Sequence, residues 1–311
     1  MKQLLKSNID GTVLFKKVII YLIAAILCFG LYIKFVMDDK MAGLIISYLL
    51  FLVSLFVLQF QFIIMSINAL ALDDEKFNFT GTFGEYIKIN VLGVVFTILT
   101  LGIYSPWYSK KYISYLVDNT FCGDKALEFR GKAFKLFKYS IFTIFIPLVV
   151  ILVVFVPAMI SSLTGDVSRM GVAITVYLLG LIYIMVAYTI VYYRWLIDVR
   201  FANEDVSIEL SLAKTAGFLL FQGFLSIITL GIYTYIAEIK IFRYFVDRII
   251  LTNGDSGSVR EMKFVGKISQ GFWLFVGQTI LSIITLFIYY PWAFAKMRNW
   301  IISNIEIDDR I

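Results

Sequence analysis

The side chains that could carry chemistry are few, and they lack the partners that most reactions need. The 311 residues include no histidine, which excludes Ser-His-Asp triads, histidine-liganded zinc and imidazole proton shuttles. Two cysteines, Cys28 and Cys122, cannot form a four-thiolate metal site or a Cys-x-x-Cys redox pair. The chain also has no GxxxxGK[ST] phosphate loop and no GxGxxG fingerprint. The sequence therefore predicts no catalytic residue, no metal site and no cofactor.

Acidic residues leave one route to catalysis. Asp118 and Asp247 occupy matching positions of an internal repeat and have the chemistry of a general acid or base. A symmetric structural role, such as capping the following turn, explains the same recurrence. We expect a protein that is not an enzyme.

The elements that must position these residues are dictated by the composition. Hydrophobic residues make up 60% of the chain and charged residues 16%, whereas soluble domains average about 45–50% and about 25%. The mean hydropathy is +0.86. The sequence predicts an all-α integral membrane protein, a polytopic helical bundle with internal repeats. The net charge is +6, and the lysines and arginines cluster beside apolar segments, which favours membrane lipids over nucleic acid as partners.

Seven apolar segments are long enough to be candidate membrane helices, since a span needs about 20 residues. They lie at 15–37, 42–71, 87–105, 134–162, 170–197, 216–235 and 271–290. Amides in these segments, such as Gln222 and Gln278, predict hydrogen bonds between helices; a polar pathway is the alternative.

An octet recurs three times, as TILTLGIY at 97–104, SIITLGIY at 226–233 and SIITLFIY at 282–289. Flanking residues match at constant offsets, which indicates duplication. A second signature, FNFTGT at 77–82, LEFRGK at 127–132 and MKFVGK at 262–267, alternates apolar and polar residues up to a glycine. It predicts short cytoplasmic β-strands; extended loops that lead into helices are the alternative. The candidate motif residues are Phe79, Gly81, Gly102, Tyr104, Pro106, Trp107, Phe129, Gly131, Gly231, Tyr233, Phe264, Gly266, Tyr289, Pro291 and Trp292.

These motifs carry a resemblance. Phe-x-Gly before an apolar helix, then TLGIY, then the aromatic and basic SPWYSKKYISYLVDNT resembles the YjgN-like family of bacterial inner-membrane proteins. The resemblance covers 77–311, and the second copy departs from it by having Tyr235-Ile236 in place of Pro-Trp. It implies a multi-pass protein of the bacterial inner membrane and supplies no catalytic residues. We accordingly divide the chain into a two-helix segment, 1–76, and a repeat-containing membrane domain, 77–311.

Charge distinguishes two topologies, because lysine and arginine favour the cytoplasmic side. If all seven segments cross, the basic residues divide 13 to 15 and show no bias. If the three repeat segments re-enter on one side, only Lys34, Lys40 and Arg169 of the 28 lie outside, which leaves 25 inside. This charge bias favours re-entry; an inverted repeat, as in many transporters, is the alternative.

Two functional hypotheses follow. Gly- or Pro-interrupted helices and amides in apolar segments suggest a transporter or channel, which needs a polar cavity that reaches the membrane midplane. Wedge-like hairpins and a basic cytoplasmic face suggest instead a membrane-organising or lipid-interacting protein. Its candidate headgroup contacts are Lys110, Lys111, Lys132, Lys135, Lys138, Lys240, Arg243 and Arg248. The oligomeric state does not follow from the sequence.

Overall fold

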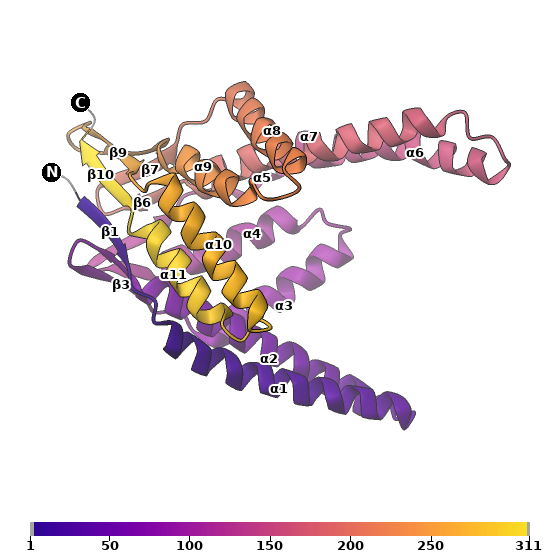
Figure 1. The fold of residues 1–311 in the computed structure, drawn as a ribbon, viewed down its shortest axis with the longest axis horizontal. Coiled ribbons are helices and arrows are strands. Elements are labelled where there is room, and N and C mark those ends of the chain that lie inside the picture. Colours follow the sequence, from indigo (N-terminus) through magenta and orange to yellow (C-terminus); the bar gives the residue numbers. More distant parts are fainter. Residues whose placement is uncertain (1–2, 310–311) are drawn as a thin grey trace. The chain divides into compact units, whose positions relative to one another are not determined.

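The computed structural model describes residues 3–309, and within them one arrangement of elements occurs five times. Each module has a strand, a helix, a return helix and a second strand (Figure 1). The first comprises β1 (Gln3–Ser7), α1 (Gly11–Met37), α2 (Met41–Asn68) and β2 (Leu70–Leu72). The second comprises β3 (Glu75–Phe79), α3 (Phe83–Leu99), α4 (Ser105–Asp118) and β4 (Thr120–Cys122).

The third module has the longest helices. It comprises β5 (Lys125–Phe129), α5 (Ala133–Ser140), the π-helical η1 (Ile141–Phe145), α6 (Ile146–Leu163), α7 (Met170–Leu196) and β6 (Val199–Phe201). The fourth comprises β7 (Glu204–Ile208), α8 (Leu212–Ile228), α9 (Thr234–Val246) and β8 (Ile249–Asn253). The fifth comprises β9 (Val259–Phe264), α10 (Ile268–Ile284), α11 (Tyr290–Ile302) and β10 (Ile305–Asp309).

The strands form a closed barrel in the order β1-β10-β9-β8-β7-β6-β5-β4-β3-β2. The resolved pairings are antiparallel, for example Phe77 with Cys122 and Val206 with Leu251. The all-α prediction is therefore wrong. It failed because strands of three to six residues contribute little to hydropathy, and only three of them carry the Phe-x-Gly signature. These three, β3, β5 and β9, are true strands and not extended loops.

One backbone hydrogen bond closes the base of every module. The residue just after the first strand donates its N–H to the carbonyl of the residue just before the second strand. The five bonds run from Asn8 to Ala69 (3.0 Å), Thr80 to Asn119 (2.9 Å), Arg130 to Asp198 (2.8 Å), Glu209 to Arg248 (2.9 Å) and Val265 to Asn304 (2.9 Å). Both ends of each helical hairpin are thus held at the barrel.

Four helical stretches are long and apolar enough to cross a membrane: Gly11–Met37, Met41–Asn68, Ala133–Leu163 and Met170–Leu196. They correspond to the four segments that the charge distribution assigns to complete crossings. Ala133–Leu163 contains η1, which ends two residues before Pro147, where the missing proline N–H accommodates a π-type turn. The other three hairpins have limbs of 17 and 13 or 14 residues. At 1.5 Å per residue these limbs measure about 26 Å and about 20 Å, short of the roughly 30 Å of a hydrocarbon core.

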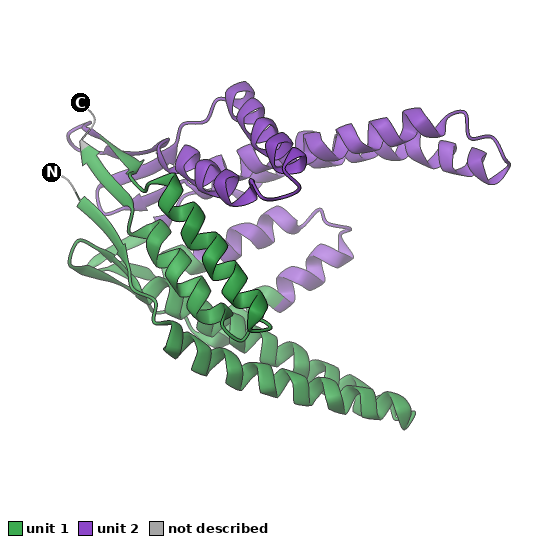
Figure 2. Ribbon diagram, viewed as in Figure 1, with its two compact units in different colours: residues 1–90, 115–127, 260–311 green, residues 91–114, 128–259 purple. Residues whose placement is uncertain are grey.

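Two compact units make up the chain (Figure 2). One contains residues 1–90, 115–127 and 260–311, and the other contains 91–114 and 128–259. The first unit has a buried cluster of Ile9, Leu14 and Ala295, against which Phe62 and Phe294 pack. The second has a core of Val186, Ile190, Ile208, Leu210 and Phe245. The candidate sites described below each lie within one unit.

Candidate functional site

The Phe-x-Gly motif is a packing device at the base of a hairpin. In the second module the Phe79 ring lies edge-on to the Tyr115 ring at 5.8 Å and next to Gly81. A Cβ at position 81 would lie 2.5 Å from the Tyr115 hydroxyl oxygen, which donates a 2.6 Å hydrogen bond to the Thr82 carbonyl. Only glycine leaves room for both rings.

The same contact recurs in two other modules. Phe129 lies edge-on to Trp195 at 5.1 Å beside Gly131, and Phe264 lies edge-on to Trp300 at 5.8 Å beside Gly266. The return-helix aromatics were not among the predicted motif residues. The available signal was an aromatic residue four or five positions before the return strands β4, β6 and β10.

The TLGIY motif reverses the chain between two short helices. Leu101 and Gly102 have φ of 50° and 90°, and Leu230 and Gly231 have 50° and 88°. The left-handed region suits glycine. The Thr100 hydroxyl accepts from the Tyr104 N–H at 2.9 Å and starts the return helix, and Thr229 does the same for Tyr233 at 3.0 Å. The motif is thus a turn with a built-in helix cap.

The third copy departs from this pattern. Phe287 replaces glycine yet keeps a φ of 65°, after Leu286 at 49°. A left-handed conformation costs a residue with a Cβ about 1–2 kcal/mol. Phe287 is also a wall residue of the cavity described below. Strain of this kind is commonest where the surrounding structure or a functional site requires it.

Buried amides join the two limbs of hairpins α8–α9 and α10–α11. Tyr233 donates to Gln222 at 2.8 Å and accepts from Lys240 at 3.0 Å. Tyr289 repeats this between Gln278 (3.1 Å) and Lys296 (2.9 Å). The predicted hydrogen bonds between helices are therefore confirmed for both amides. The second module has Gly93 at this position, and the Tyr108 ring packs against it.

The predicted headgroup contacts divide by their partners. Lys111, Lys132, Lys135 and Lys138 are exposed, and Lys110 is partly exposed. Arg243 instead pairs with Asp247 at 3.4 Å, and the guanidinium of Arg248 stacks on the Tyr244 ring at 3.4 Å. Lys240 belongs to the hydrogen-bond chain through Tyr233. The exposed members of the set, the four lysines and Arg243, remain accessible to lipid.

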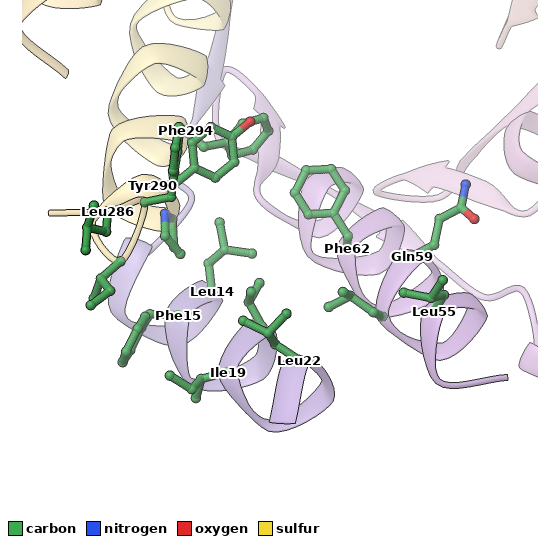
Figure 3. Close-up of a pocket in the computed structure, with 15 residues that line it drawn as sticks. Leu14, Phe15, Ile19, Leu22, Leu55, Gln59, Phe62, Leu286, Tyr290 and Phe294 are labelled. Atoms are coloured by element: carbon green, nitrogen blue, oxygen red, sulfur yellow. The ribbon is translucent and has the colours of Figure 1, made fainter. Parts of the chain in front are cut away.

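A cavity of about 700 Å³ lies between α1, α2 and the α10–α11 hairpin, within the first unit. Figure 3 shows Leu14, Ile19 and Leu22 on α1 and Phe62 on α2, with Tyr290 and Phe294 on α11. The remaining wall residues are Phe15, Val18, Leu55, Leu58, Gln59, Leu286, Phe287, Ile288 and Pro291. Only Gln59 and Tyr290 bring polar atoms, so the cavity offers an apolar surface.

Aromatic contacts hold the cavity walls together. Phe15 stacks on Trp292 at 4.6 Å, and the Trp292 indole donates to the Thr12 hydroxyl at 3.2 Å. On the other side Phe62 meets Phe294 with ring centroids 5.0 Å apart. Of the predicted motif residues, Pro291 lines the cavity and Trp292 supports it from α11.

The fold and these sites define a multi-pass membrane protein in which helical hairpins connect the strands of a small β-barrel. The chain belongs to the family described as "Bacterial protein of unknown function (DUF898)", whose model matches residues 21–258. It is 30% identical over 121 residues to the inner membrane protein YjgN of Escherichia coli K12, and 33% identical over 123 residues to YjgN of E. coli O157:H7.

Each of these matches covers 39% of this chain and 28% of the relative. The match therefore spans little more than a quarter of the length of these relatives. No solved structure matches the chain. Together with the four apolar helices, the relatives place the chain in the bacterial inner membrane as a multi-pass protein.

Proposed function

We propose that this protein interacts with membrane lipids, holding an acyl chain in its apolar cavity, and that it binds lipid without transforming it. The observation that carries the proposal is the cavity itself. Its volume of about 700 Å³ lies within the range of about 300–1,000 Å³ that is typical of ligand sites. The side chains of its walls are mostly apolar, as the binding of a hydrocarbon chain requires.

The helices that form the cavity walls support a lipid occupant. Two of its walls are α1 and α2, both long and apolar enough to cross the membrane. The third is the turn of the short α10–α11 hairpin, where Leu286 and Phe287 expose 84% and 66% of their surface. Side chains this apolar and this exposed belong in hydrocarbon, so acyl chains surround the site.

A transporter or channel is the second candidate, supported by the interrupted helices of the three short hairpins. It needs polar groups along a passage. The amide oxygens of Gln222 and Gln278 already accept hydrogen bonds from Tyr233 and Tyr289, and the cavity walls are apolar. The geometry therefore supports lipid binding better than solute passage.

The test fills the cavity. Leu58 lines it, whereas Leu49 on the same helix is 54% exposed and is not a wall residue. The full-length protein is purified in mild detergent, and retained phospholipid is counted by native mass spectrometry. Leu58→Trp should reduce retained lipid, and Leu49→Trp should not.

An unchanged lipid count in Leu58→Trp, or an equal loss in both variants, would count against the proposal. Ion or dye flux through proteoliposomes of the wild-type protein that Leu58→Trp blocks would favour a channel.

A further inference from the structure

Arg298 on α11 is a partly buried cation whose guanidinium faces the Phe294 ring and has no hydrogen-bond partner for its Nε atom. Its Nε atom is buried and makes no hydrogen bond. No carboxylate within residues 3–309 forms an ion pair with it. Other arginines differ: Arg200 and Arg130 both pair with Asp205, at 2.9 and 2.6 Å.

An uncompensated guanidinium that is partly removed from water is unfavourable, because a close counter-charge is what offsets the loss of hydration. Residues 3–309 do not supply that counter-charge. An anionic ligand would supply it, and a guanidinium binds phosphate oxygens through two parallel hydrogen bonds.

The position of Arg298 relates it to the cavity. Tyr290, Phe294 and Arg298 are spaced four residues apart on α11, so they lie along one face of the helix. The first two line the cavity, and the Arg298 guanidinium carbon lies 6.0 Å from the Phe294 ring centroid. Arg298 is two turns, about 12 Å, from Tyr290, toward β10 and the base of the hairpin.

We infer that the cavity takes an anionic phospholipid of the cytoplasmic leaflet, with an acyl chain between α1, α2 and α11 and the phosphate on Arg298. The glycerol backbone then passes the edge of Phe294, which separates the cavity from the guanidinium. This inference rests on the proposed lipid binding. It adds that the headgroup is anionic and that Arg298 binds it.

The experiment measures thermal stability of the full-length protein in detergent, with and without lipid. The probes are phosphatidylglycerol, zwitterionic phosphatidylcholine and inorganic phosphate. The variants are Arg298→Gln, Arg298→Lys and, as a matched control, Arg200→Gln, which removes an arginine that already has a partner.

For the wild type, phosphatidylglycerol should raise Tm in a concentration-dependent way, because a ligand that binds the folded state stabilises it. Phosphatidylcholine should raise it less, and inorganic phosphate, which has no acyl chain, should leave it unchanged. Arg298→Gln should match or exceed the wild-type Tm without lipid and should respond equally to both lipids. Arg298→Lys should keep part of the preference, and Arg200→Gln all of it.

Three results would overturn the inference: equal responses of the wild type to both lipids, an anionic preference that survives Arg298→Gln, or a Tm rise with inorganic phosphate equal to that with lipid. The last would identify a soluble anion as the ligand. If Leu58→Trp retains less lipid while the wild type shows no anionic preference, lipid binding stands and only the role of Arg298 fails. If Leu58→Trp retains the wild-type amount, the proposed function fails.

Discussion

Replacing Gly131 by alanine should test whether Phe-x-Gly is a packing device. An added Cβ would lie 2.8 Å from Cε1 of Phe129 and 2.9 Å from Nε1 of Trp195. Neither ring is free to move away. Trp195 is fully buried, and its indole donates a 3.1 Å hydrogen bond to the Lys132 carbonyl, while Phe129 packs edge-on against it.

The cost has two parts. Overpacking a tight interior destabilises by about 1–3 kcal/mol, and losing the Trp195 hydrogen bond costs about 1 kcal/mol. The free energy of unfolding should therefore fall by about 2–4 kcal/mol. At about 2–4 °C per kcal/mol for a chain of this order of size, Tm should fall by about 5–15 °C. Gly171→Ala is the control: it lies in α7 with open space around it, so alanine should stabilise by about 0.5–1 kcal/mol.

The assay is thermal unfolding of the purified protein in detergent, followed by near-ultraviolet circular dichroism of the tryptophans. A double-mutant cycle with Phe129→Leu separates the steric cost from other effects. The smaller side chain should make Gly131→Ala much less costly. A Gly131→Ala cost below about 1 kcal/mol, or a cost that Phe129→Leu leaves unchanged, would refute the steric reading, since overpacking costs at least that much.

Other positions give further expectations. Gly102→Ala places a Cβ in open space at a φ of 90° and should cost about 1–2 kcal/mol from backbone strain alone; Gly217→Ala, helical and equally open, should stabilise. Asp205 accepts hydrogen bonds from Arg130 and Arg200, which lower its pKa. Because the pKa is lower in the folded state, the ionised carboxylate stabilises the fold at pH values above its unfolded pKa of about 3.9. This stabilisation is lost as the pH falls through the folded-state pKa. The difference in the free energy of unfolding between wild type and Asp205→Asn, on the order of 0.2–1 kcal/mol for an exposed pair, should therefore be present at pH 7 and vanish below the folded-state pKa of Asp205, as thermal unfolding at both pH values would show. In spheroplasts of a strain whose chain lacks both native cysteines, an impermeant maleimide should label Ser168→Cys, between α6 and α7, but not Ser256→Cys, between β8 and β9. The reverse labelling, or labelling of both, would contradict the topology.

The sequence made the spanning helices predictable, because apolar runs of 20 or more residues have few alternatives. It also placed the chain reversals at TLGIY, since glycine permits the left-handed turn that Gly102 and Gly231 adopt. The limits of the short helices were less accurate. The first short helix begins at Phe83, whereas the expected apolar segment begins at residue 87. The two differ because Glu85 and Lys88 lower the local hydropathy without ending the helix.

The barrel was less predictable, because the sequence pattern that indicates its strands is spread over short segments. β1 and β7 end at Ser7 and Ile208, where β3, β5 and β9 end at phenylalanine, and β2, β4 and β6 have three residues each. Period-two alternation needs four or more residues to be read. Arg298 was missed for a related reason: its significance is the lack of a counter-charge, which only the packed structure reveals.

Strands and hairpins in this fold depend on each other. Two paired strands of three to five residues are marginal in water, and an open sheet would leave unpaired edges; closure into the barrel removes the edges. The three short helical hairpins depend on the barrel in turn, because both ends of each hairpin are held at its base. Their anchorage is the backbone hydrogen bond at the base, such as Thr80 to Asn119 at 2.9 Å, together with the Phe79–Tyr115 contact beside it. A change that loosens the base of one hairpin should therefore alter the position of its turn. For the α10–α11 hairpin that turn is a wall of the cavity, so packing at Phe264 and Trp300 should influence lipid binding at Leu286 without touching the lipid.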